Sequence, residues 1–375
     1  MRRAVLLALS TALVAAPLAM AQAAPAAAPA KAAAAYHAPR TPFGQPDLSG
    51  NWSNATLTPM IRNPKYGAQL VMPPAAVKAE EAEMAREFKE GDMPTDPNAP
   101  VQKGEDKNVR PEFAAAGGDV GGYNIGWLDP GRAVMRVNGE PRTSLITTET
   151  GRPPPRKDGE QASLFGRGRG GGGRMGSFDS YETRSLGERC IIGFGRNAGP
   201  PMFPNGFYNN DYQILQTPDA VVIEVEMVHD MRIVRLNAKH RTDGVRPWFG
   251  DSIGWWDGDT LVVETTNVPK EEAFFGAWKD LKVTERFRRV APDRLYYSFQ
   301  VEDPSVWDKP WGGEYEFHPL KGELYEYACH EGNYALPDML QGARRQEAEA
   351  AAKAQAPAAA ATPAKAGGGR PGGAN

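Results

Sequence analysis

The sequence lacks the motifs by which several enzyme classes are recognised. It contains no Gly-x-Ser-x-Gly nucleophile elbow, no P-loop, no Rossmann glycine run and no His-Glu-x-x-His pair. Hydrolase, nucleotide-binding and zinc-protease interpretations therefore lose their usual support. An excess of positive charge is also missing, since 43 basic residues face 46 acidic ones. This balance argues against a nucleic-acid partner, because phosphate contacts need a basic surface.

A second long apolar run is missing after the N-terminus, so no membrane span is expected once a leader is removed. The N-terminus itself has the pattern of a secretory signal peptide. Arg2 and Arg3 precede an apolar segment from Ala4 to Leu18, and Ala19–Ala21 forms an A-x-A cleavage site. Because no Cys lies at the cleavage point, a lipoprotein anchor is not expected. The mature chain is predicted to be soluble and periplasmic or secreted, with an uncleaved anchor as the alternative.

Composition divides the rest of the chain. Ala/Pro-rich, Gly/Arg/Pro-rich and Ala/Lys/Pro/Gly-rich stretches separate segments with regular patterns. The expected parts are a signal peptide at 1–21, an Ala/Pro linker at 22–40, an N-terminal part at 41–150, a flexible insertion at 151–180, a main β domain at 181–345 and a disordered tail at 346–375.

Only two cysteines are present, Cys190 and Cys329. In an exported protein an even count favours a disulfide between them. The alternative is a reactive Cys329 beside His330.

The patterning predicts a mostly β protein. The N-terminal part should contain a first strand at Gly50–Trp52, a helix over 74–90 and a hairpin turning at Asn138-Gly139. From Tyr212 onward, short alternating segments are joined by short turns, and the last is expected at Glu323–Cys329. Eight or more such strands without helical crossovers favour an antiparallel, lipocalin-like barrel, with a β-sandwich as the alternative. A short helix is expected at 339–350.

Two polar runs at the ends of strand-like segments are the best candidate sites, Glu226–Arg232 and Tyr325–Tyr334. If Val221–Ile233 is one strand, period-2 counting places His229 among apolar residues and Arg232 on the opposite face. A bulge at His229 would bring both sets to one cavity. The alternative is a core histidine with a surface ion pair.

Glu285 is expected to be buried, because it shares a face with Leu281, Val283 and Phe287. A buried carboxylate needs a partner, and Arg232 or Arg286 could supply it, in a site or in a structural ion pair.

His330 has the pKa range of a general base or a metal ligand. The alternative is that its segment only closes the barrel end. A zinc site would use His229, Asp230, His330 and Glu331, but their spacing matches no known pattern; no cofactor is otherwise expected. The catalytic candidates are His229, Arg232, Glu285, His330 and Tyr334. The ligand-binding candidates are Glu226, Asp230, Asp251, Trp255, Glu331 and Asn333.

Four motifs together resemble a family of uncharacterised exported bacterial proteins, over about residues 41–56 and 186–345. They are Asp47–Trp52, Glu226–Arg232, Gly250–Asn267 and Tyr327–Tyr334. The resemblance implies export and no established activity. The Gly/Arg insertion near residue 170 departs from the family's more compact pattern. A looser similarity to lipocalin-like barrels, through Gly50–Trp52 and the segment from Trp256 to Glu264, implies a ligand cavity.

Three functions follow from these observations. The first is binding of a small, partly apolar ligand in the barrel. The second is a lyase or isomerase that uses His, Arg and Glu in the same pocket. The third is a structural or envelope-interaction protein.

Overall fold

The computed structural model describes residues 36–91, 129–159, 178–193, 197–204 and 208–355. The predicted signal peptide, most of the predicted linker and most of the Gly/Arg insertion lie outside these ranges. No helix in the described part of the chain is long and apolar enough to cross a membrane.

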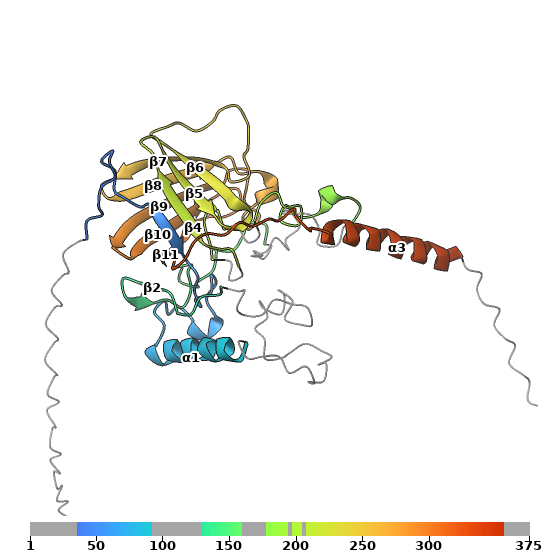
Figure 1. Cartoon of the computed structure of the whole chain (residues 1–375), viewed down its shortest axis with the longest axis horizontal. Helices are drawn as coiled ribbons and strands as arrows, with labels where there is room; N and C mark the ends of the chain where they lie inside the picture. The colour runs from blue at the N-terminus through green and yellow to red at the C-terminus, as the bar shows by residue number, and fades with distance from the viewer. Residues whose placement is uncertain (1–35, 92–128, 160–177, 194–196, 205–207, 356–375) are drawn as a thin grey trace, which may run out of the picture. The chain divides into compact units, whose positions relative to one another are not determined.

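Nine strands form a closed barrel, which confirms the predicted barrel and excludes the sandwich (Figure 1). Around the ring, the order is β1, β11, β10, β9, β8, β7, β6, β5 and β4. The strands are β1 (Gly50–Ser53), β4 (Tyr212–Gln216), β5 (Ala220–Val225), β6 (Asp230–Leu236), β7 (Asp251–Asp257), β8 (Thr260–Thr266), β9 (Lys282–Ala291), β10 (Arg294–Glu302) and β11 (Trp311–Pro319).

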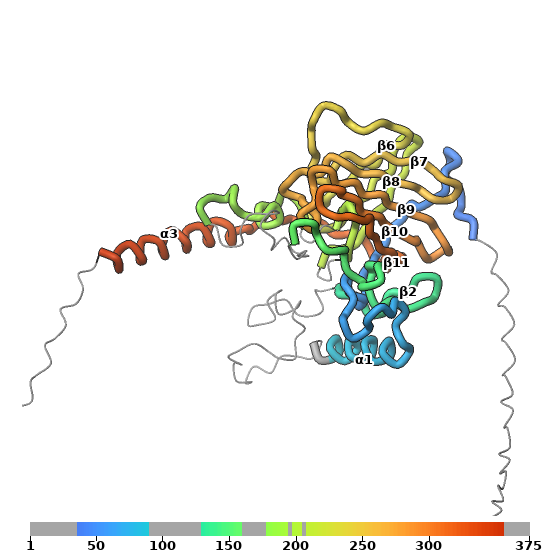
Figure 2. Tube along the Cα trace, turned by 180° about the vertical axis from the view of Figure 1, so that it is seen from behind, coloured from blue at the N-terminus to red at the C-terminus, as the bar shows by residue number. Residues whose placement is uncertain are grey.

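The barrel is mostly antiparallel, as predicted, and one pair of strands departs from this pattern. Strands β6 and β7 run parallel, with Val234 opposite Ser252 and Leu236 opposite Gly254. Parallel neighbours cannot be joined by a tight turn. Residues 237–250 therefore form a crossover loop, which projects from the barrel in both views (Figures 1 and 2).

Alternation of buried and exposed residues fixes which side chains fill the barrel. In β9 the inward positions are Val283, Glu285 and Phe287, and in β10 they include Tyr297 and Phe299. Both strands follow the period of two that their sequences predict. The interior is consequently apolar, with a few large polar side chains set into it.

The N-terminal additions match the prediction closely. Helix α1 covers Pro74–Gly91, and the hairpin of β2 (Arg136–Val137) and β3 (Glu140–Pro141) turns at Asn138-Gly139, both with positive φ as a type I′ turn requires. Trp52 is buried in β1, and its indole N–H donates to the carbonyl of Leu48 at 3.1 Å.

Residues 197–203 occupy the barrel interior as a chain segment that belongs to no strand. Ala198, Met202 and Phe203 are buried, and the Phe203 ring lies 5.1 Å from the Phe299 ring. We call residues 197–203 the inner segment. No sequence pattern predicted it, because it has neither the period of a helix nor that of a strand.

The chain after β11 differs from the prediction. The expected strand Glu323–Cys329 does not form. Residues 320–334 instead form an irregular segment, which we call the strap. At its start, the amide of Leu320 donates a hydrogen bond to the carbonyl of Asn51. Helix α3 then covers Ala335–Gln355, so it extends beyond position 346, where a disordered tail was expected. The predicted disulfide is confirmed: it joins Cys190 to Cys329 in the strap, and so fits an oxidising compartment.

Candidate functional site

An ion pair crosses the barrel interior between two strands that are not neighbours. Arg232 on β6 donates two hydrogen bonds to Glu285 on β9, at 2.6 and 3.0 Å. Arg232 is 2% exposed and Glu285 is 0% exposed. Their pairing confirms the expectation that Glu285 is buried with an arginine partner.

Arg232 reaches the interior because the chain reverses direction just before it. Strand β5 ends at Val225, and a short 3-10 turn over Met227–His229 leads into β6. Val228 and His229 have φ of 58° and 46°, so the backbone does not continue as one strand. The period-2 count over one continuous strand from Val221 to Ile233, which placed Arg232 on the face opposite the apolar residues, is therefore wrong.

The opposite face of β6 shows the same shift. Met231 and Ile233 are 54% and 57% exposed, whereas Arg232 and Val234 point inward. The position at His229-Asp230 where a bulge was considered is in fact the end of the turn that joins β5 to β6.

A tyrosine connects the ion pair to the inner segment. The hydroxyl of Tyr297 donates to Glu285 Oε1 at 2.8 Å and accepts the amide N–H of Met202 at 2.9 Å. The hydroxyl of Tyr315 donates to the carbonyl of Met202 at 3.1 Å, and the Met202 sulfur lies 3.3 Å from Arg232. Both backbone polar groups of Met202 are thus held by tyrosines of the barrel wall.

A second polar chain runs from β1 to the inner segment. The Asn54 amide nitrogen donates to the hydroxyls of Tyr212 and Tyr315 at 3.3 and 3.2 Å. Tyr212 in turn donates to the carbonyl of Asn197 at 3.0 Å. No sequence motif predicted this chain of hydrogen bonds, although Tyr212 on β4 and Tyr315 on β11 fall on inward positions of predicted strands.

Three buried polar atoms of this network have no hydrogen-bond partner. They are Nε of Arg232, Oδ1 of Asn54 and Oδ1 of Asn197. Buried polar atoms are usually paired with protein or water, so these three would be satisfied by an ordered water or by another polar group. The three atoms together offer one donor and two acceptors.

Charge in the network is fixed by burial and by the ion pair. Although burial alone would lower the pKa of Arg232, the neighbouring Glu285 raises it, so the guanidinium stays charged. Burial raises the pKa of Tyr212. Burial also raises the pKa values of Tyr297 and Tyr315, to well above the ordinary value for tyrosine. These hydroxyls therefore remain protonated at neutral pH and act as hydrogen-bond donors.

Carboxylates with raised pKa values cluster near the β5–β6 turn. Burial raises the pKa of Asp230 to about 7, although the amide of Gly193 donates to it at 2.7 Å. Burial also raises the pKa of Asp211 to about 7, with repulsion from Asp129 and Glu226 adding to the effect. Burial is also the main cause of the raised pKa of Glu226, whose carboxylate accepts a hydrogen bond from the amide of Tyr325 at 2.6 Å.

The remaining candidates from the two polar runs do not join the interior network. His229, His330, Glu331 and Tyr334 are exposed. Asn333 is half-buried and donates to the carbonyl of Glu188 at 3.3 Å, which helps hold the strap beside the disulfide. Within the described residues, no three His, Cys, Asp or Glu side chains are grouped so that they could hold a metal ion. The proposed zinc ligands are thus not brought together.

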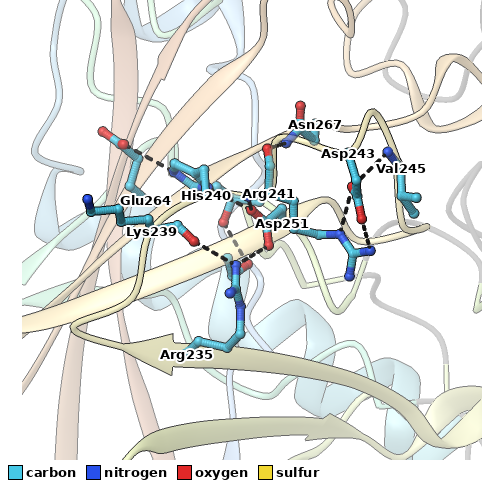
Figure 3. Close-up of polar contacts among 11 residues, drawn as sticks. Arg235, Lys239, His240, Arg241, Asp243, Val245, Asp251, Glu264 and Asn267 are labelled. Carbon is cyan, nitrogen blue, oxygen red and sulfur yellow. Dashed lines mark hydrogen bonds and ion pairs between the residues drawn. The ribbon is translucent and has the colours of Figure 1, made fainter.

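Asp251 and Trp255 lie on the outward face of β7. Trp255 is 39% exposed. Asp251 is buried beneath the crossover loop and accepts bonds from Arg235, from His240 and from the amide of Arg241, at 2.7, 2.9 and 2.8 Å (Figure 3). His240 also contacts Glu264 Oε1 at 3.2 Å. His240 was not among the predicted site residues, because it lies in no motif of the sequence.

No protein-family model and no curated protein matches the chain.

Proposed function

We propose that this chain is an exported protein that binds a small, partly apolar ligand inside its β-barrel. The polar contacts would come from Arg232 and Asn54 on the wall and from Asn197 on the inner segment. The aromatic rings that line the interior, including Phe203 and Phe299, would contact the apolar part of the ligand.

The observation that carries this proposal is the set of three unpaired atoms, Arg232 Nε, Asn54 Oδ1 and Asn197 Oδ1. Leaving a buried polar atom unpaired costs about 1–3 kcal/mol. A ligand with N–H or O–H groups for the two amides and an acceptor for the guanidinium would remove that cost. The tyrosine hydroxyls that fix Asn54 and the inner segment would hold the site in shape before binding.

Catalysis is supported less well. A lyase or isomerase needs an acid or base beside the group that stabilises charge. His229 and His330 are exposed, whereas Arg232 is buried and paired with Glu285. The interior hydroxyls have raised pKa values, which suits hydrogen bonding better than proton abstraction.

The test is a search for a retained molecule, followed by binding to matched variants. Native mass spectrometry of the mature protein purified from its own source would identify a ligand that copurifies, and thermal-shift screening of small amphipathic compounds would find others. Asn54→Ala should weaken binding of any such compound about tenfold. Asn51→Ala is the control, because Asn51 lies three positions earlier, on β1, and its side chain accepts a bond from Gln213 on the outer face of the barrel.

Two results would contradict the proposal. One is a compound whose affinity is equal in Asn54→Ala and Asn51→Ala. The other is a protein that retains nothing and whose melting temperature responds to no compound in the screen.

A further inference from the structure

The crossover loop, residues 237–250, presents a feature that ligand binding does not use. It projects away from the barrel, between β6 and β7, in both views (Figures 1 and 2). Val245 is 48% exposed and Trp248 is 40% exposed on this loop. These two large apolar side chains lie three positions apart on the loop, and their exposed parts are accessible to a partner.

The base of the loop is held firmly to the outer surface of the barrel. Asp251 receives bonds from the side chains of Arg235 and His240 and from the amide of Arg241 (Figure 3). Although burial alone would raise its pKa, these bonds lower the pKa of Asp251, so it stays ionised. His240 lies between Asp251 and Glu264, and the loop is therefore fixed on two neighbouring strands.

The far side of the loop is fixed as well. The guanidinium of Arg246 donates to the carbonyls of Val268, Trp278 and Lys279 at 2.8, 3.3 and 3.2 Å. The amide of Val245 donates to Asp243 at 3.1 Å. Val245 and Trp248 are thus held in place next to well-bonded neighbours, which reduces the entropy lost when a partner covers them.

The charge of the loop is opposite to that of the whole chain. Residues 237–250 contain Lys239, Arg241 and Arg246 but one acidic residue, Asp243, whereas the chain carries a net charge of −3. Lys239 and Arg241 are exposed, and Arg241 pairs with Asp243, so the net positive charge of the loop comes from Lys239 and Arg246. The carbonyls that receive Arg246 bind its guanidinium without neutralising its charge.

We propose that the crossover loop docks this protein on an anionic lipid surface. Tryptophan and aliphatic side chains flanked by Lys and Arg are typical of protein segments that bind the surface of a bilayer. The tryptophan ring enters the headgroup region, and the cationic side chains are attracted to acidic lipids. The apolar part of the loop is small, so the docking is weak and reversible and depends on salt. Such docking would hold a ligand-binding protein at a membrane surface, but it does not depend on ligand binding.

The experiment is cosedimentation of the full mature protein with vesicles. One set contains phosphatidylglycerol and phosphatidylcholine, and the other contains phosphatidylcholine alone. We expect the anionic vesicles to bind the protein at low salt and to release it at high salt. Trp248→Ser should reduce binding roughly tenfold, and the double variant Lys239→Gln with Arg241→Gln should abolish the preference for anionic vesicles.

Trp255→Ser is the matched control, because Trp255 is equally exposed but lies on strand β7. Near-UV circular dichroism would show that each variant is folded. The proposal is overturned if the protein does not bind anionic vesicles, if binding falls equally in Trp255→Ser, or if neutral vesicles bind as well. Self-association that depends on Trp248 without vesicle binding would assign the loop to a second copy of the chain and would also overturn it.

Discussion

Arg232 and Glu285 form a bidentate ion pair across the barrel interior, although 53 positions separate them in the sequence. Strands β7 and β8 lie between β6 and β9 in the ring, so the pair connects opposite parts of the wall and not adjacent strands. Tyr297 supplies a further bond to Glu285 Oε1.

Removing one charge of this pair is expected to be costly. Glu285→Gln leaves the guanidinium of Arg232 buried without a counter-charge, which should reduce the free energy of unfolding by about 3–5 kcal/mol. Urea denaturation would measure this loss. Glu302→Gln is the control, since Glu302 pairs with Lys282 on the surface at 3.5 Å and should cost under about 1 kcal/mol.

Replacing both partners should restore most of the stability. The double variant Arg232→Met with Glu285→Leu leaves no uncompensated charge, and buried ion pairs replaced in this way often cost nothing. If Glu285→Gln alone unfolds like the wild-type protein, the pair does not contribute to stability as the structure indicates.

The stability of the protein should fall as the pH rises from about 4 to about 7. The pKa of Asp230 is about 7 in the folded protein because it is buried, whereas an unfolded aspartate titrates near 4. In this interval the folded state holds a proton that the unfolded state has released, so each further pH unit costs up to about 1.4 kcal/mol. Urea denaturation at pH 5 and pH 8 would detect the loss.

Asp230→Asn tests the origin of this pH effect. The amide keeps an oxygen for the N–H of Gly193 but cannot ionise, so the difference in stability between pH 5 and pH 8 should shrink. Part of it should remain, because Asp211 has a pKa of about 7 and acts in the same direction. An unchanged difference would show that Asp230 titrates normally.

The disulfide should stabilise the protein mainly through the unfolded chain. Cys190 and Cys329 are 139 positions apart, and closing so long a loop is worth at most about 4–5 kcal/mol in the chain-entropy model. The double variant Cys190→Ser with Cys329→Ser should therefore melt at a lower temperature, and a reducing agent should lower the melting temperature of the wild type alone. A reductant effect on the double variant would point to some other cause.

Loss of the Asp251 carboxylate should free the crossover loop. Asp251→Ala removes the acceptor for Arg235, His240 and the amide of Arg241, so hydrogen exchange over residues 237–250 should become faster. Asp257→Ala is the matched control, because Asp257 is an exposed aspartate at the other end of β7 and lies outside the loop. Equal acceleration in both variants would argue against anchoring by Asp251.

Local patterns in the sequence were sufficient for most strands and for the buried glutamate. In β9 the period of two placed Glu285 on the same face as Val283 and Phe287. A buried carboxylate needs a positively charged or hydrogen-bonding partner, and few arginines were candidates for that role. The compartment implied by the signal peptide was sufficient for the disulfide. These inferences succeeded because each depends either on residues that are close together in the sequence or on the number of cysteines in the chain.

The failures depend on contacts between distant segments or on backbone turns without glycine. Val228 and His229 adopt positive φ without being Gly or Asn, so nothing marked the turn that points Arg232 inward. Glu323–Cys329 alternates like a strand, but it lies outside the closed ring as a strap. The partners of Asn54, Tyr212 and Met202 are set by the inner segment, whose position follows from no local pattern.

The number of strands accounts for the crossover loop. In a ring where every strand runs opposite to its neighbours, direction alternates, and only an even number of strands can close. Nine strands force at least one pair to run in the same direction, and here that pair is β6 and β7. Residues 237–250 therefore cannot be shortened to a two-residue turn without opening the ring or removing a strand. An odd-numbered barrel must keep an external connection of some length, and in this protein the connection carries Val245 and Trp248.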